Sequence, residues 1–188
     1  RWRDLFNASF EVLLYDLTST YFESDPPLDE DDKRRHGYSR DHRPDLNQVM
    51  LDLIVEHQAG IPVLMKPLSG NTSDTRDFGQ VVTEHVRQLQ TTYGTTYLVA
   101  DSALYSEENL QKLVDTGTTW ITRVPATLTE AQHALEQATP EAMLPLKEGY
   151  RYHVRVSTYG GVAQRWVLIY SEHRRPQAQP DVDVAAGL

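Results

Sequence analysis

The chain has 188 residues, of which 39% are hydrophobic and 24% charged, so it is long enough for one folded domain and too apolar for a disordered polyelectrolyte. It contains no cysteine, which excludes a disulfide framework and any thiolate zinc site. No apolar run approaches the roughly 20 residues of a membrane span. We therefore expect a cytoplasmic protein that does not enter membranes.

The net charge of −9 argues against a whole-surface attraction to nucleic acid, but the charges are segregated along the chain. Six acids and no base lie between Glu23 and Asp32, whereas five bases and one acid lie between Lys33 and Arg43. A local basic segment can contact phosphates inside an acidic protein. The alternative is a solvated loop whose acidic and basic halves pair with each other.

Apolar, β-branched runs predict three strands in the first part of the chain. They lie at residues 10–16, 48–56 and 61–68, and the last two join across a hairpin at residues 57–60. The first run closes with an acid. We therefore expect a buried strand that carries the carboxylate of Asp16 at its carboxyl end.

Helices and strands alternate in the next part. Thr75 as a cap and apolar residues at helical spacing predict a helix that ends near Gly94. Residues 95–101 form a second strand that ends in an acid, and a second helix starts at Ser106 before a strand at 118–124. The order βββαβαβ predicts an α/β fold with a ribonuclease-H-like mixed sheet. A Rossmann domain would need a Gly-rich turn after the first strand, which the sequence lacks.

Beyond residue 125 the pattern becomes β-rich. A hairpin is predicted from strands at 150–158 and 165–171. We therefore divide the chain into a ribonuclease-H-like core at 8–125, a β-rich insertion at 126–175 and a loose tail at 176–188.

Asp16 and Asp101 are candidate metal ligands because of the predicted strand order. In a ribonuclease-H-like sheet the two strands that they close are neighbours, so both carboxylates come to one edge. Two close carboxylates repel unless a divalent cation lies between them, and hard oxygen ligands select Mg²⁺ or Mn²⁺. The alternative is that each aspartate only caps the loop or helix after its strand.

Four motifs stand out in chain order. They are YDLTSTYFE at 15–23, HGYSRDHRPDLNQ at 36–48, GIPVLMKPLSGNTSD at 60–74 and VADSALYSEENL at 99–110. Together they resemble bacterial insertion-sequence transposases of the DDE type, in the group with a β-rich insertion. The resemblance implies that Asp16 and Asp101 are the first two of three catalytic acids and bind Mg²⁺ or Mn²⁺.

The resemblance also implies a reaction and partners. A divalent ion pair would activate water or a 3′-hydroxyl for in-line attack on a phosphodiester, giving cleavage at the element's ends and then strand transfer. The implied partners are therefore the DNA of the element's ends and of the target. A homodimer is expected by analogy, since transposition needs paired ends.

The third acid that the resemblance implies is a Glu inside a Tyr/Arg/Glu/Lys signature, and no stretch of the chain matches it. Glu172 is the nearest substitute, but it directly follows a predicted strand and no helix surrounds it. We therefore expect a truncated or frameshifted fragment that does not transpose DNA alone. Two alternatives stay open: a ribonuclease-H-like nuclease whose third acid is local, such as Glu107 or Glu108, and a non-catalytic remnant that binds DNA or dimerises.

Several other polar residues have both a functional and a structural interpretation. Thr18, after the first acid, is a candidate for phosphate binding or a turn former. Arg40 and Arg43 are candidate contacts to the DNA backbone, and pairing with Asp41 and Asp45 is the alternative.

Tyr105 lies four residues after Asp101. It is a candidate to flank a splayed base, and core packing is the alternative.

Overall fold

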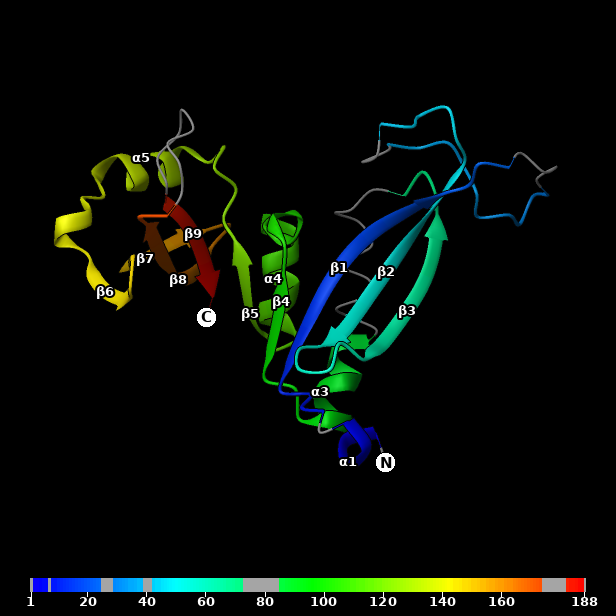
Figure 1. The fold of residues 1–188 in the computed structure, drawn as a ribbon, viewed down its shortest axis with the longest axis horizontal. Coiled ribbons are helices and arrows are strands. Elements are labelled where there is room, and N and C mark those ends of the chain that lie inside the picture. The colour runs from blue at the N-terminus through cyan, green and yellow to red at the C-terminus, as the bar shows by residue number, and fades with distance from the viewer. Residues whose placement is uncertain are drawn as a thin grey trace. The chain divides into compact units, whose positions relative to one another are not determined.

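The computed structural model describes residues 2–6, 8–24, 29–38, 42–72, 85–173 and 182–187. The chain divides into two units, Arg1–Val99 and Ala100–Leu188 (Figure 1). This division reflects only which residues contact one another. The boundary predicted after residue 125, between the core and the insertion, stays a prediction. No helix within the described ranges is long and apolar enough to cross a membrane.

Unit 1 is built on three long antiparallel strands that lie side by side in Figure 1. Its sheet has the order β3-β2-β1-β4. The elements are α1 (Trp2–Phe6), β1 (Val12–Tyr21), β2 (Gln48–Glu56), β3 (Pro62–Ser69), α3 (Arg87–Tyr93) and β4 (Tyr97–Ala100). The predicted hairpin of β2 and β3 is confirmed.

The core of unit 1 lies on one face of this sheet. Every second residue of β2 is buried, and Leu17, Met50 and Leu68 form an apolar cluster across the three long strands. Leu13 and Ile54 are fully buried, and each such side chain contributes about 1.5–3 kcal/mol to stability.

A buried carboxylate closes the β2–β3 hairpin. Glu56 is 0% exposed, and its oxygens accept hydrogen bonds from the backbone N–H groups of Gln58 at 3.1 Å, Ile61 at 3.3 Å and Ala59. Gly60 has a φ of 66°, which the turn requires and which favours glycine. Burial alone would raise the pKa of Glu56, but the three N–H donors hold it below its usual value.

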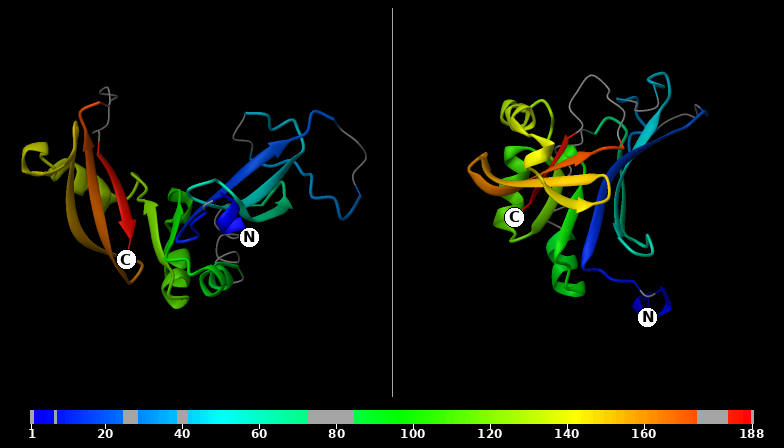
Figure 2. Two further views of the ribbon diagram at one scale, coloured as in Figure 1. Left: turned by 60° about the horizontal axis from the view of Figure 1, so that its bottom comes forward. Right: turned by 60° about the vertical axis from the view of Figure 1, so that its left-hand side comes forward.

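Unit 2 contains a second group of antiparallel strands in the order β5-β9-β8-β7-β6. Figure 2 shows the orange and red strands β8 and β9 side by side. The helices are η2 (Ser102–Leu104), α4 (Glu107–Asp115), α5 (Thr129–Gln137) and η3 (Pro140–Ala142). The strands are β5 (Thr119–Arg123), β6 (Leu144–Lys147), β7 (Tyr150–Tyr159), β8 (Val162–Ser171) and β9 (Val182–Gly187).

The β7–β8 hairpin is confirmed, and helices cover one of its faces. Alternate residues of β8 from Val162 to Leu168 are buried on that face, including Trp166 at 0% exposed. α4 packs against β5 and β8, and Glu130 of α5 accepts a hydrogen bond from Ser157 of β7 at 2.8 Å. The order βββαβαβ is present as predicted, from β1 to β5.

Two elements differ from the sequence-based expectation. β1 does not end at Asp16 but continues to Tyr21, because it pairs with β2 from Leu13 to Tyr21. Residues 182–187 form β9, in a region where a loose tail was predicted, because their backbone pairs with β5 on one side and β8 on the other. The predicted helix start at Thr75 lies outside the described residues, whereas its end before Gly94 is confirmed.

Candidate metal centre

Asp16 lies in the middle of β1, opposite Leu53 of β2. Its neighbours Tyr15 and Leu17 are buried, so the alternation of the strand places Asp16 on the other, exposed face. Among the described residues its carboxylate has no hydrogen-bond or ion-pair partner. Nothing in the described part of the chain therefore occupies either oxygen.

Asp101 directly follows β4 and caps η2. Its Oδ1 accepts a hydrogen bond from Ala103 N at 3.0 Å, and its carbonyl oxygen accepts one from Thr122 Oγ1 at 2.6 Å. The side chain is exposed, and its second carboxylate oxygen has no partner within the described part of the chain. This is the capping role that the structural alternative predicted, and it leaves one oxygen open.

Asp16 belongs to unit 1 and Asp101 to unit 2. Within the described ranges no group of three or more His, Asp or Glu residues could hold a metal ion. The shared site of these two carboxylates therefore stays a prediction.

Thr18 is a strand residue and not part of a turn. It lies opposite Leu51 of β2 and is half-buried. The interpretation of Thr18 as a turn former is wrong, because β1 continues through it and a β-branched threonine suits a strand.

The candidate DNA-binding arginines have different outcomes. Arg40 lies outside the described residues. Arg43 forms a bidentate ion pair with Asp45, with Nε–Oδ1 at 3.0 Å and Nη2–Oδ2 at 2.9 Å. The hydrogen bond from Arg43 holds the pKa of Asp45 below its usual value. Contact of Arg43 with DNA would have to compete with Asp45.

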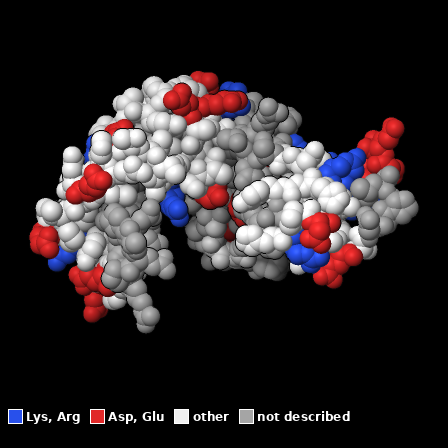
Figure 3. All heavy atoms as spheres, turned by 90° about the horizontal axis from the view of Figure 1, so that it is seen from above, with Lys and Arg blue, Asp and Glu red and all other residues white. Residues whose placement is uncertain are grey.

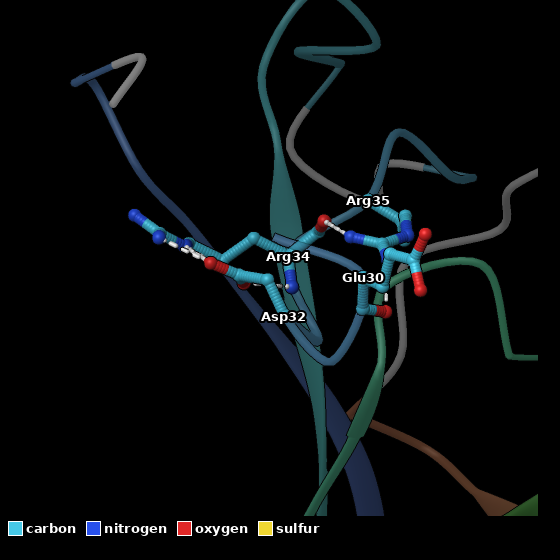
Figure 4. Close-up of polar contacts among 4 residues, drawn as sticks. All are labelled: Glu30, Asp32, Arg34 and Arg35. Carbon is cyan, nitrogen blue, oxygen red and sulfur yellow. Dashed lines mark hydrogen bonds and ion pairs between the residues drawn. The ribbon is translucent and has the colours of Figure 1, made fainter. Parts of the chain in front are cut away.

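The basic segment is joined to the acidic stretch before it (Figure 4). Arg34 Nε donates to both oxygens of Asp32 at 2.9 and 3.0 Å, and this holds the pKa of Asp32 at about 2. Arg35 donates to the carbonyl oxygens of Arg34 at 2.8 Å and Glu30 at 3.2 Å. On the face drawn in Figure 3 the described basic groups are scattered and several lie beside acids. Such pairing is what a loop with two complementary halves requires.

Sequence reasoning missed how this segment is attached to the sheet. Gln48 is 2% exposed, and its Nε2 donates to the carbonyl oxygens of Gly70 at 2.7 Å and Tyr38 at 3.0 Å. Arg35 and Gln48 also exchange backbone hydrogen bonds of 3.0 and 2.9 Å. A Cβ on Gly37 would lie 2.1 Å from the oxygen of Gly70. We call Gly37, Gln48 and Gly70 the glycine clamp.

The glycine clamp joins two of the sequence motifs. Gly37 and Gln48 come from HGYSRDHRPDLNQ, and Gly70 comes from GIPVLMKPLSGNTSD. The sequence carries two signs of the clamp. One is the glycine in each of the two motifs, and the other is the polar residue Gln48 at the start of a predicted buried strand.

Tyr105 is 6% exposed and belongs to the core of unit 2. Of the two local acids considered as a third ligand, Glu108 pairs with Lys112 at 2.6 Å, whereas Glu107 is exposed and only its aliphatic atoms lie close to Gly160. Glu172 directly follows β8, as expected from the sequence, and is exposed in a turn.

The fold is similar to that of a solved transposase. The structure of the piggyBac transposase synaptic complex with hairpin DNA matches with a TM-score of 0.52, at 13% sequence identity. The match covers 95% of this chain and 33% of that chain, so this chain spans about a third of that protein. The likeness shows that the chain has a ribonuclease-H-like α/β fold, as predicted.

The family follows from the sequence. The family model of the transposase DDE domain matches residues 8–174, which is most of the chain. The chain therefore belongs to the transposase DDE domain family, and the resemblance carried by the four motifs is confirmed. No curated protein matches the chain.

Proposed function

We propose that this chain is the part of a DNA transposase that supplies the first two metal-binding acids, Asp16 and Asp101. The observation that carries the proposal is the family match over residues 8–174, within which both aspartates lie. The proposed substrates are the DNA of an element's ends and of its target.

The residues fit a hard divalent cation. Mg²⁺ and Mn²⁺ prefer carboxylate oxygens, and both aspartates are exposed with at least one oxygen that has no partner among the described residues. When bound, the ions would supply charge stabilisation for phosphodiester attack. The chain's own contribution is to hold the Asp16 carboxylate on β1 and the Asp101 carboxylate directly after β4.

A backbone contact joins the residue before β1 to the start of β4. Glu11, just before β1, accepts hydrogen bonds through its carbonyl oxygen from Thr96 N at 2.8 Å and Tyr97 N at 3.0 Å, just before and at the start of β4. Asp16 follows Glu11 in the chain at the same spacing at which Asp101 follows Thr96. The proposal that the two acids share a metal ion rests on the family match and on their open carboxylate oxygens.

The proposed site lacks its third acid in this chain. No stretch matches the Tyr/Arg/Glu/Lys signature, so we propose that these 188 residues hold one divalent ion weakly and do not carry out strand transfer alone. A homodimer and binding to paired ends remain parts of the proposal that concern the whole transposase.

The metal site is tested by calorimetry with Mn²⁺. We expect one Mn²⁺ per chain, and either Asp16→Asn or Asp101→Asn should weaken binding about tenfold or more, since loss of supporting residues around a metal already costs about 10- to 100-fold. Asp115→Asn is the matched control, because Asp115 is an exposed acid at the end of α4 and its substitution removes the same charge. Unchanged affinity in both site variants would refute the shared site.

Contact of the basic segment with DNA is tested by salt dependence. For a short duplex, replacing Arg40 and Arg43 with Ala should reduce the slope of log affinity against log salt by about 0.9 for each lost phosphate contact. Lys112→Ala, on α4, serves as a control for the loss of one charge. A slope equal to that of the unaltered chain would mean that Arg43 serves only its pair with Asp45.

A further inference from the structure

The loop after Asp101 is held by side chains of the β-rich insertion. Tyr105 closes η2, and its hydroxyl donates to Gln164 Oε1 of β8 at 2.9 Å. The same hydroxyl accepts a hydrogen bond from Trp166 Nε1 at 3.2 Å. The three side chains are 6%, 3% and 0% exposed, so these contacts are made away from water.

The β7–β8 turn adds a second contact at the same place. The Tyr159 ring stacks on the Tyr105 ring with centroids 5.1 Å apart, and Gln111 Nε2 of α4 donates to the carbonyl oxygen of Gly160 at 2.6 Å. Gly160 has a φ of 56°, and a Cβ there would lie 2.7 Å from Glu107 Cγ. The insertion hairpin is therefore packed closely on the residues that follow Asp101.

Asp101 and Tyr105 are the two ends of one short helical turn. η2 lies between them, with Leu104 N donating to the carbonyl oxygen of Asp101 at 3.3 Å and Tyr105 N donating to Ser102 O at 3.1 Å. Ala103 N of the same turn donates to the Asp101 carboxylate. A displacement at Tyr105 is thus transmitted to the carboxylate through a single turn of backbone.

We propose that Tyr105, Gln164 and Trp166 are positioning residues that fix the carboxylate of Asp101, and that the insertion sheet thereby acts as a brace for the second acid. The brace is inferred from contacts inside unit 2, and its importance for metal binding rests on the proposed function. Burial raises the pKa of Tyr105 to about 12, so the hydroxyl keeps its proton and remains a donor throughout the neutral range.

The brace is tested with Tyr105→Phe, which keeps the ring and removes only the hydroxyl. Amide hydrogen exchange at Ala103 reports on the turn without any metal, and we expect exchange to become about fivefold faster, as for the loss of one buried hydrogen bond. Mn²⁺ affinity should fall about tenfold, at the low end for a residue that supports a metal ligand. Gln164→Leu, which removes the acceptor, should act in the same direction.

Ser157→Ala is the matched control. It removes a partly buried hydrogen bond of the same sheet, the one to Glu130, but does not touch the Tyr105 hydroxyl. It should leave both Ala103 exchange and Mn²⁺ affinity unchanged. A purely structural role of Tyr105 would give Tyr105→Phe and Ser157→Ala the same profile.

The two readouts separate the brace from the proposed function. If Asp101→Asn weakens Mn²⁺ binding while Tyr105→Phe alters neither exchange nor affinity, the brace is refuted and the metal site stands. If Tyr105→Phe accelerates exchange at Ala103 while Asp101→Asn leaves Mn²⁺ binding unchanged, the brace stands and the metal site is refuted.

Discussion

Substitution of Gly70 by alanine is expected to lower the free energy of unfolding of unit 1 by about 3 kcal/mol, the upper range for overpacking a close contact. The added Cβ would lie 2.0 Å from the carbonyl oxygen of Gln48 and 2.5 Å from that of Arg35. Both are backbone atoms that cannot move without breaking the exchange of hydrogen bonds between Arg35 and Gln48. Urea denaturation measures the loss, and faster amide exchange at Arg35 would locate it at the glycine clamp.

Gly60→Ala separates steric overlap from backbone strain. Gly60 has a φ of 66°, and a Cβ added there would meet nothing within 4 Å, so alanine should cost about 1 kcal/mol from the left-handed conformation alone. A loss at Gly70 no larger than the loss at Gly60 would contradict the clamp.

Removal of the Glu56 carboxylate is the second large effect. Glu56→Ala leaves three backbone N–H groups of the hairpin without their acceptor, and hydrogen bonds to charged groups are worth about 1.5–3 kcal/mol. We expect a loss of about 2 kcal/mol in the free energy of unfolding at pH 7, measured by denaturant titration. Glu56→Gln, which keeps one acceptor oxygen, should lose less.

The pH dependence of this effect has a defined sign. The pKa of Glu56 is lower in the folded chain than the value of 4.5 for an unperturbed glutamate, so the folded state binds its proton less well than the unfolded state. The stabilisation is therefore fully present above pH 4.5 and is lost as the pH falls through the folded pKa. The stability difference between the unaltered chain and Glu56→Gln should shrink on acidification. A constant difference would mean that the carboxylate charge does not contribute. Glu141→Gln, at an exposed glutamate of η3, is the control for the loss of one carboxylate charge in the same pH titration of stability.

The sequence predicted the elements whose pattern is local. The β2–β3 hairpin has alternating buried residues and a glycine in its turn, and α4 begins at the predicted cap, where Ser106 Oγ accepts from Asn109 N at 3.3 Å. Such signals depend only on neighbours in the chain, so they are visible without a structure.

Features that depend on distant partners were not predictable. Asp16 and the hydroxyl residues after it look like a strand end, but pairing with β2 extends β1 to Tyr21. Gln48 and Gly70 are adjacent only because the sheet brings them together, and Tyr105 meets Trp166 only through the insertion hairpin. Propensity gives way to tertiary pairing at these places.

The residues of the candidate site could be predicted from the sequence, but the contacts around them could not. Asp16 and Asp101 are ordinary strand acids by pattern, and only the motifs around them identify the chemistry. Two hydroxyl residues near Asp101 carry no sequence signal of a role at the site: Thr122, which donates to the carbonyl oxygen of Asp101, and Tyr105, which bonds Gln164 at the other end of η2. Such hydroxyl groups more often serve a local turn or the core.

The place of β9 between β5 and β8 has a consequence for folding during synthesis. β5 and β8 emerge from the ribosome before β9, so each has an unpaired side until β9 arrives. The pairing of β9 with β5 also closes a long loop, which is slow because chain entropy is lost before the contact forms. Unit 2 therefore completes its sheet late, and a brace for Asp101 that depends on β8 becomes firm only once β9 has been synthesised.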